Sequence, residues 1–301
     1  MNTSTYDYVT DKIIAQLETG TVPWVRPWSV ASDPFPRNAV SQRPYRGINN
    51  VLLGMESQVQ GYATNQWLTF KQAQSLGGHV RKGERSSLII YYESRMVEKE
   101  DAEPLADGDE AEKRFIPLIK VFNVFNLDQV EGLPETHQPL ALESDWDADS
   151  IAEQIIERSG AEIRHQGFKA FYSPPNDLIY LPGKQTFADA ASYYSTALHE
   201  LCHWTGATSR LGRKLGRRFG DSAYAMEELI AELGAAFLSA HCRLDGRLQH
   251  ASYIASWLEV LQRDKRAVFV AAAQAQKAAD YLLEQADLLA PEMLASLREA
   301  A

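Results

Sequence analysis

Hydrophobic positions at the start of the chain follow a helical period. Between residues 6 and 17 they recur every three or four residues, at Tyr6, Val9, Ile13, Ile14 and Leu17. Gly20 and Pro23 interrupt this pattern, so we expect an N-terminal amphipathic helix that ends before them. Similar periodicity predicts helices over Ile48 to Val59 and over Thr69 to Leu76.

The pattern changes after these helices. Ser87 to Val97 and Phe115 to Leu127 are rich in β-branched and aromatic residues, which predicts two paired strands. The segment between them, Lys99 to Arg114, is charged and rich in small residues. We interpret it as a flexible acidic insertion in the hairpin.

A domain boundary is expected near Glu131 to Asp147, where prolines precede an acidic run without periodicity. Beyond it, the pattern predicts a helix from Asp149 to about Ser159, a hairpin over Phe171 to Leu181 and long helices to the end. The predicted class is α+β with two domains, a small mixed domain at 1–132 and a mainly helical domain at 147–301. Residues 133–146 are the expected linker.

Composition is that of an ordinary globular protein. The chain has 301 residues, of which 45% are hydrophobic and 23% charged, and it contains only two cysteines. The N-terminus lacks the pattern of a signal peptide, and no apolar run reaches the roughly 18 residues of a membrane span. We therefore expect a cytoplasmic protein with no disulfide framework and no membrane partner.

Charge is distributed unevenly along the chain. The net charge is −10, yet residues 1–95 carry 10 Lys/Arg against 7 Asp/Glu, which leaves 20 against 33 for the remainder. Prolines between Pro23 and Arg46 predict an extended loop that exposes its arginines. Cations and aromatic rings together are typical of sequence-tolerant binding to single-stranded DNA. The candidate contacts are Arg26, Trp28, Phe35, Arg37, Arg43, Tyr45, Arg46, Arg81, Lys82 and Arg85. The alternative for Trp24, Trp28 and Trp67 is that they are core residues.

Residues 199–203 read HELCH, which matches the H-E-x-x-H pattern of zinc metallohydrolases. Apolar residues upstream recur at helical spacing, so the motif is expected on an amphipathic helix. His199 and His203 are then one turn apart on one face and can bind the same metal ion. Glu200 lies beside them as the candidate base that takes a proton from water.

The third metal ligand is expected downstream, in the segment AMEELIAELGAAFLSA. Glu228 is the preferred ligand, and Glu232 would accept a hydrogen bond from a ligating imidazole, although the two roles could be exchanged. Glu227 points about 100° away from Glu228 around the helix and is the weaker candidate. The expected ion is Zn²⁺ or another divalent metal such as Mn²⁺. A metal with a purely structural role is the alternative.

Other residues with reactive side chains are assigned lesser roles. Cys202, His241 and Cys242 are expected to be structural. A tyrosine could donate a hydrogen bond to a substrate carbonyl, and the spacing does not select among Tyr180, Tyr194 and Tyr224. The basic run from Arg210 to Gly220 is interpreted as a solvated loop, with contact to phosphate or to an acidic substrate as the alternative.

Long segments of the chain resemble one known family. In the N-terminal half they are YDYVTDKIIAQLETGTVPWVRPW, YRGINNVLL, WLTFKQAQSLGGHVRKG and VFNVFNLDQVEGL, and in the C-terminal half HELCHWTG, RLGR and YAMEELIAELGAAFL. Nearly end to end, the chain resembles the ArdC-type antirestriction proteins of conjugative plasmids, and it is also similar to the N-terminal regions of TraC-type plasmid primases.

The resemblance implies an N-terminal domain that binds single-stranded DNA and a C-terminal metallopeptidase domain of zincin-like fold. By position, the ligands would be His199, His203 and a glutamate of the EELIAE segment, with Glu200 as the catalytic base. The implied function is protection of incoming plasmid DNA from host restriction, and a restriction enzyme is a candidate protein substrate. Two alternatives stay open: a non-catalytic shield of single-stranded DNA with a structural metal, and a regulatory metalloprotease that cleaves a repressor.

Overall fold

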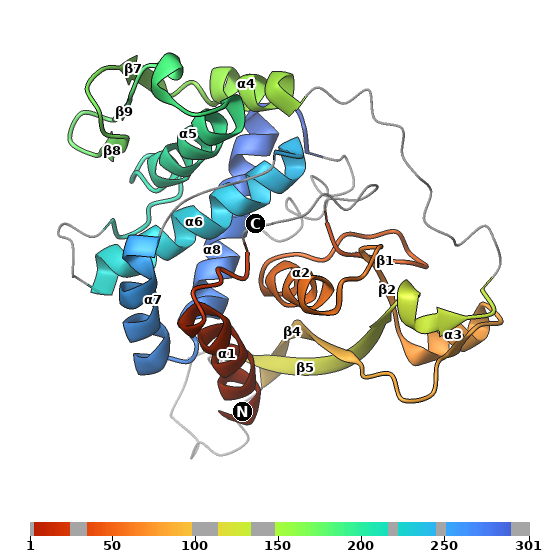
Figure 1. Cartoon of the computed structure of the whole chain (residues 1–301). Coiled ribbons are helices and arrows are strands. Elements are labelled where there is room, and N and C mark those ends of the chain that lie inside the picture. Colours follow the sequence, from red (N-terminus) through yellow and green to blue (C-terminus); the bar gives the residue numbers. More distant parts are fainter. Residues whose placement is uncertain are drawn as a thin grey trace, which may run out of the picture.

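The computed structural model describes residues 3–24, 35–97, 114–133, 148–215, 222–244 and 251–289. It is a two-domain α+β protein, with the strands of the N-terminal half on one side and a group of long helices on the other (Figure 1). Within the described residues, no helix is long and apolar enough to cross a membrane. The predicted linker and the predicted acidic insertion fall almost entirely outside these residues.

In the N-terminal half, the residues that the structure describes form three helices and two small sheets. Its helices are α1 (Thr3–Glu18), α2 (Ile48–Gln60) and α3 (Phe70–Ser75). Its strands are β1 (Arg37–Asn38), β2 (Gln66–Leu68), β3 (His79–Val80), β4 (Ser87–Val97), β5 (Arg114–Asn126) and β6 (Val130–Glu131), with a short 3-10 helix at Leu127–Gln129. The three helices predicted here are confirmed. The predicted loop from Pro23 to Arg46 contains β1, and residues 25–34 of it are not described.

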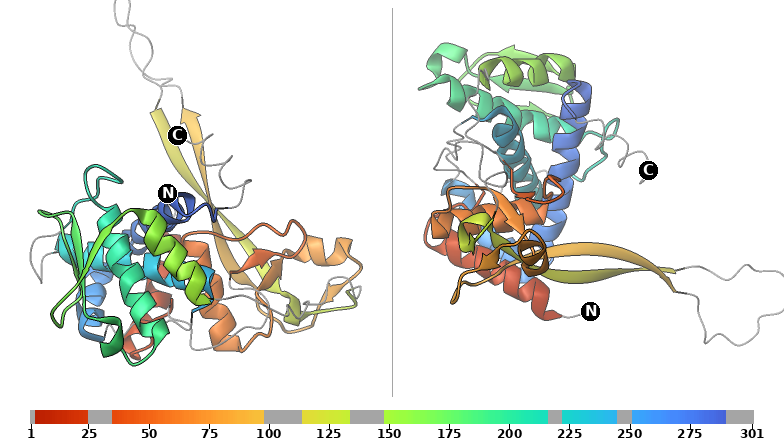
Figure 2. Two further views of the ribbon diagram at one scale, coloured as in Figure 1. Left: turned by 90° about the horizontal axis from the view of Figure 1, so that it is seen from above. Right: turned by 90° about the vertical axis from the view of Figure 1, so that its right-hand side faces the viewer.

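The larger sheet has the strand order β1-β2-β5-β4, and a second sheet pairs β3 with β6. The predicted pairing of the two long strands is confirmed, because β4 and β5 run antiparallel from Ser87 opposite Val124 to Val97 opposite Arg114. Figure 2 shows this hairpin projecting from the body of the molecule. On the outer edge of β4, the side-chain amide of Asn49 bonds to both the N–H and the carbonyl of Ile90, which fixes α2 to the sheet.

The described part of the C-terminal half contains five helices and a three-stranded sheet. The helices are α4 (Ala148–Ser159), α5 (Ala190–Thr205), α6 (Ser222–Cys242), α7 (Ala251–Arg263) and α8 (Ala267–Gln285), with a 3-10 helix at Lys184–Thr186. The strands are β7 (Glu162–His165), β8 (Phe171–Ser173) and β9 (Leu178–Leu181), in the order β7-β9-β8. The predicted hairpin of β8 and β9 is confirmed. β7, which pairs parallel to β9, was not predicted, because its largely exposed polar residues lack a strand pattern.

One hydrophobic core unites the two halves. Val9 and Ile13 of α1 belong to the same buried cluster as Trp257 of α7 and Ala272 of α8. The ring of Trp24 meets that of Trp257 edge to face, with centroids 5.5 Å apart. Helices α1 and α2 of the N-terminal half therefore pack against α7 and α8 of the C-terminal half, and the two halves are expected to unfold together.

The tryptophans of the N-terminal half are core residues wherever the structure describes them. Trp67 is fully buried beside Leu53 and Val124, and Trp24 is 7% exposed. Trp28 lies outside the described residues. Neither described tryptophan is therefore available for stacking on a DNA base.

Candidate metal centre

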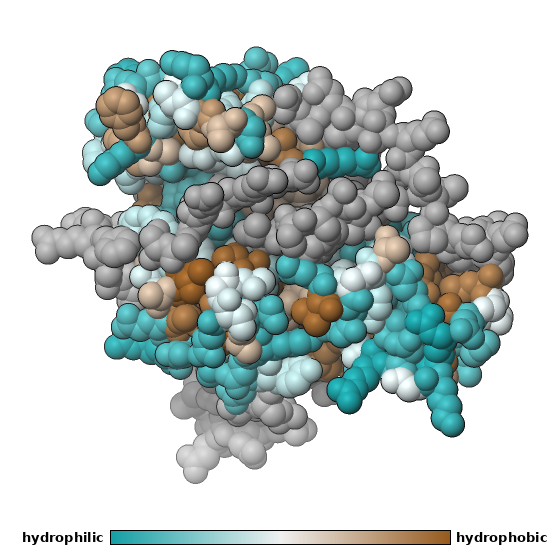
Figure 3. Space-filling view, viewed as in Figure 1, coloured by the Kyte–Doolittle hydropathy of each residue, from teal (hydrophilic) through white to brown (hydrophobic). Residues whose placement is uncertain are grey.

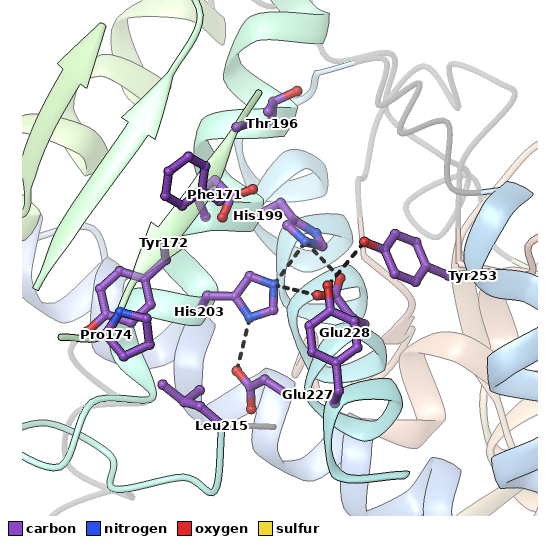
Figure 4. A pocket seen from close by; sticks show the side chains of 13 residues that line it. Phe171, Tyr172, Pro174, Thr196, His199, His203, Leu215, Glu227, Glu228 and Tyr253 are labelled. Carbon is purple, nitrogen blue, oxygen red and sulfur yellow. Dashed lines mark hydrogen bonds and ion pairs between the residues drawn. The ribbon is translucent and has the colours of Figure 1, made fainter. Parts of the chain in front are cut away.

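The HELCH motif lies in the second half of α5, where a second apolar helix, α6, packs against it. The side chain of Asp189 accepts a hydrogen bond of 2.7 Å from the backbone N–H of Ser192 and so caps the start of α5. His199 and His203 extend from successive turns of α5 toward Glu228 on α6 (Figure 4). The predicted helix and the predicted convergence of the three residues are both present.

The ligand atoms are spaced as a metal ion requires. The Nε2 atoms of the two imidazoles are 3.1 Å apart, and each lies 3.5 Å from an oxygen of Glu228. Four ligands at about 2.0–2.1 Å in tetrahedral geometry would be separated by about 3.3–3.4 Å. The three side chains therefore fit one divalent ion, and among the described residues this is the one cluster of histidine, cysteine and carboxylate groups with such spacing.

Each imidazole has a further carboxylate at its outer nitrogen. Nδ1 of His203 donates to Glu227 at 3.2 Å, and Nδ1 of His199 lies 3.5 Å from Glu232. Glu232 has the position that the sequence predicted for a group orienting an imidazole. Glu227, the weaker candidate for a ligand, contacts the outer side of His203 instead. Residues adjacent in a helix can both face a partner helix that crosses at an angle, which explains why both glutamates reach α5.

The buried carboxylates make the pocket strongly attractive to a cation. Burial alone would lower the pKa of His199, but Glu228 and Glu232 outweigh it and raise this pKa to about 10. Glu227 and Glu228 likewise raise the pKa of His203 to about 9 despite its burial. Burial favours the neutral form of Glu228, yet the two imidazoles hold its pKa well below the usual range. A divalent cation would replace the protons on this cluster.

His199, His203 and Glu228 line a pocket of about 360 Å³. Phe171 and Tyr172 of β8 line one side, and Tyr224 and Tyr253 line another. Glu200 also lines the pocket and is 6% exposed. The upper left of Figure 3, over the β7–β9 sheet, is mostly hydrophilic, with a few hydrophobic side chains among the polar ones. Phe168, between β7 and β8, is 94% exposed.

The structure distinguishes the three tyrosines that the sequence left open. Tyr180 stacks on Phe171 with ring centroids 4.8 Å apart, and Tyr194 donates a hydrogen bond of 2.9 Å to Glu153. Tyr224 lines the pocket, and its hydroxyl is 3.3 Å from that of Tyr253. Sequence analysis missed Tyr253, because nothing along the chain connects it with a motif on α5.

The basic run after α5 was interpreted as a solvated loop, and its first part is not one. The guanidinium of Arg210 stacks on Trp204 at 3.7 Å from the ring centroid and forms an ion pair with Asp177 in the β8–β9 turn. It also donates to the hydroxyl of Tyr172. Arg210 therefore ties the hairpin that lines the pocket to the end of α5. Residues 216–220 lie outside the described residues.

The candidate DNA contacts of the N-terminal half have different environments. Arg43, Arg81, Lys82 and Arg85 are exposed. Phe35 and Arg37 are half-buried, as is Tyr45, whose pKa is raised by burial. Arg46 forms an ion pair with the buried Asp280 of α8, which makes it part of the contact between the two halves. Arg26, like Trp28, lies outside the described residues.

Cys202 and Cys242 are buried, and His241 is half-buried. Cys202 and Cys242 form no disulfide, and burial raises the pKa of each thiol to about 12. Burial also lowers the pKa of His241. These environments agree with the structural roles expected for the three residues.

Comparison with known families divides the chain into two matched regions. Residues 3–125 match the N-terminal domain of the anti-restriction factor ArdC, and residues 150–274 match a family described as zincin-like metallopeptidase. Among solved structures, the chain is similar to the antirestriction ArdC protein of plasmid R388 in its metal-free form, with 40% identity, a TM-score of 0.78 and coverage of 96% of this chain and 100% of that one. The Mn(II)-bound form of the same protein gives a TM-score of 0.76, 40% identity and coverage of 93% and 97%.

Two further relatives differ in length. The Sinorhizobium fredii (strain NBRC 101917 / NGR234) protein y4eC is 38% identical over 287 residues, which cover 94% of this chain and 92% of that protein. A DNA primase TraC of Escherichia coli is 38% identical over 291 residues, or 92% of this chain. The match spans only 27% of the primase, so the chain corresponds to about a quarter of that relative.

Proposed function

Because this chain belongs to the ArdC family of antirestriction proteins, we propose that it protects incoming plasmid DNA from host restriction by combining single-strand DNA binding with a metal-dependent peptidase site. The observation that carries the peptidase part is the convergence of His199, His203 and Glu228 in a pocket that also contains Glu200. The DNA-binding part rests on the ArdC N-terminal domain and on the exposed cations of that half.

His199, His203 and Glu228 would hold the ion, which leaves room for a further ligand from solvent or substrate. A divalent ion supplies Lewis acidity, which polarises a peptide carbonyl and lowers the pKa of a water molecule. Zn²⁺ is our preferred ion, because two imidazoles and a carboxylate are a typical catalytic zinc set. Mn²⁺ is the alternative, since the related R388 protein has a Mn(II)-bound structure.

The side chains around the cluster have roles in peptide hydrolysis. Glu200 would take a proton from the attacking water and pass it to the leaving amine. The hydroxyl of Tyr224 could donate a hydrogen bond to the carbonyl oxygen as negative charge develops on it. β8 is an edge strand, so an extended peptide could pair with it and lie across the pocket. The proposed substrate is therefore an extended segment of a protein, such as a restriction enzyme.

The proposed DNA contacts are Arg43, Arg81, Lys82 and Arg85, which are all exposed. Arg81 also pairs with Glu84 at 2.7 Å, a surface interaction that phosphate could replace. Contacts to phosphate alone would bind strands of unrelated sequence equally well. We leave Arg46 out of this set, because its ion pair with Asp280 would have to break.

Binding is tested with fluorescent single-stranded oligonucleotides of unrelated sequence and the full chain. The variant Arg81→Ala/Lys82→Ala/Arg85→Ala should weaken binding to all of them and reduce the slope of log K against log salt by about 2, since each single-strand phosphate contact contributes about 0.7. The matched control Lys169→Ala/Arg263→Ala/Lys277→Ala removes the same charge from exposed positions of the C-terminal half and should have little effect. Equal effects of the two triple variants would contradict the proposed surface.

The peptidase part is tested by plasmid transfer into a restricting recipient. Glu200→Gln should retain binding to single-stranded DNA and lose both protection and cleavage of the recipient's restriction enzyme. If Glu200→Gln protects as well as the wild type, peptidase activity is not needed, and the non-catalytic shield is the correct account.

A further inference from the structure

Arg213 belongs to the loop that follows α5, and its side chain is buried, with only 5% exposed. Its guanidinium contacts both helices that bear the metal-binding residues. Toward α5 it donates to the carbonyl of Cys202 at 2.6 Å and to the hydroxyl of Thr205 at 2.8 Å. Toward α6 it donates to both oxygens of Glu227, at 2.8 Å and 3.0 Å.

The same carboxylate contacts a metal-binding imidazole. Oε1 of Glu227 accepts from Nδ1 of His203 at 3.2 Å, and Nε2 of His203 faces Glu228 and His199. Arg213, Glu227 and His203 thus form a continuous chain of hydrogen bonds that ends at the proposed metal position. Glu227 is itself 4% exposed, so Arg213 and His203 together satisfy most of its hydrogen-bonding capacity.

The geometry of this chain limits what Glu227 can do. Its two oxygens are engaged by the planar fork of the arginine, which matches a carboxylate in a fixed orientation. Held in this way, Glu227 stays on the outer side of the imidazole and does not turn inward to ligate the metal. His203 is correspondingly held with Nε2 directed into the cluster. A lysine could not impose this orientation, because it lacks the fork.

For the basic run that contains Arg213, the sequence left contact to phosphate or to an acidic substrate as the alternative to a solvated loop. For Arg213 the structure excludes this use, because its side chain is buried and all three of its nitrogens donate within the protein. Lys214, the next residue, is exposed and carries the same charge. The two neighbours therefore form a natural pair for separating the effect of position from the effect of charge.

We propose that Arg213 is a positioning residue of the metal centre: by fixing Glu227 against His203, it increases the affinity of the site for a divalent ion. This inference rests on the metal site of the proposed function. The first part of the basic run therefore has a role within the protein, and Arg213 acts on the metal only through Glu227. Loss of a group that orients a metal-binding histidine typically weakens metal affinity about 10- to 100-fold.

The test is a Zn²⁺ titration of the full chain against a chelating dye. The proteins are the wild type, Arg213→Met, Glu227→Ala, the double variant and the control Lys214→Ala. We expect both single variants to bind Zn²⁺ about 10- to 100-fold more weakly and Lys214→Ala to bind like the wild type. The double variant should match Glu227→Ala, because the contact with Glu227 is the one contact of Arg213 described here that leads to the side chain of a proposed metal ligand.

Thermal unfolding of each metal-free protein separates an effect on the metal from an effect on the fold. If Arg213→Met lowers only the unfolding temperature and keeps the wild-type affinity, Arg213 is merely structural and the inference is wrong. If the losses of Zn²⁺ affinity caused by the two substitutions multiply in the double variant, the inference that Arg213 acts through Glu227 is wrong. Should the variants fail to fold, Arg213→Lys and Glu227→Gln, which conserve size, are subjected to the same criteria. A wild-type protein that binds no Zn²⁺ would overturn the proposed metal site itself, which is a distinct result.

Discussion

Gly234 lies in α6 where this helix crosses α5, and replacing it with alanine tests the packing that brings the proposed metal ligands together. A methyl group added at this position would be 2.7 Å from Sγ of Cys202 and 3.5 Å from its Cβ. The carbonyl of Ala275 on α8 lies 3.6 Å away on another side. Cys202 is fully buried, so its sulfur would have to shift against the surrounding core or the two helices would have to separate.

Two opposing contributions determine the size of the effect. Overpacking a core typically costs about 1–3 kcal/mol. Alanine is better than glycine in a helix interior by about 0.5–1 kcal/mol. We therefore expect Gly234→Ala to lower the free energy of unfolding by up to about 2.5 kcal/mol. In a Cys202→Ala background the close contact is absent, and the same substitution should raise it by about 0.5–1 kcal/mol.

The assay is urea unfolding of the wild type, the two single variants and the double variant in the presence of a chelator. Circular dichroism and tryptophan fluorescence should give coincident transitions, since one core unites the two halves. The expected coupling between the two sites is about 1–3 kcal/mol, stabilising in the double variant. In the absence of chelator, Gly234→Ala should also bind Zn²⁺ more weakly, because the separation of α5 from α6 moves the imidazoles away from Glu228. If Gly234→Ala stabilises the protein equally in both backgrounds, the inferred close packing is wrong.

Three further predictions follow from other contacts. Arg210→Ala should lower the free energy of unfolding by about 1–2 kcal/mol. Hydrogen bonding to Arg210 holds the pKa of Asp177 below its ordinary 3.8, so this loss of stability should be constant between pH 7 and 5 and become smaller only in more acidic solution. Urea titrations at several pH values would measure it. Arg46→Ala should lower it by on the order of 3 kcal/mol, with partial rescue by Asp280→Asn, whereas a similar loss in the exposed control Arg43→Ala would speak against the ion pair as the cause. Zn²⁺ at about 100 times the wild-type dissociation constant should stabilise the wild type by about 2.7 kcal/mol in calorimetry. An equal gain in His203→Ala at the same Zn²⁺ concentration would place the ion elsewhere.

Much of this structure could be predicted from the sequence, because local patterns determine it. The periodic apolar residues of α1 and α2, and the β-branched run of β4, each reflect a face that must be buried. The proposed metal-binding pair His199 and His203 is equally local, since the spacing of four residues places both on one helix face.

The rest depends on how helices cross, which no local pattern encodes. Glu227 reaches His203, and Arg213 reaches Glu227, only because α5, α6 and the loop between them meet at one place. Tyr253 enters the pocket from α7 for the same reason. The exposure of individual side chains was equally hard to predict. Trp67 has an aromatic ring of the kind that stacks on bases, but it is fully buried. Arg46 pairs with Asp280, which is 234 residues away.

The most direct test of this account is the anomalous diffraction of a Zn²⁺-loaded crystal of the full chain. We predict one strong peak at about 2.0–2.2 Å from Nε2 of His199, Nε2 of His203 and an oxygen of Glu228. Glu227 should remain on Nδ1 of His203, outside the coordination sphere. A peak at another position, or Glu227 or Glu232 as a ligand in place of Glu228, would contradict the metal centre described here.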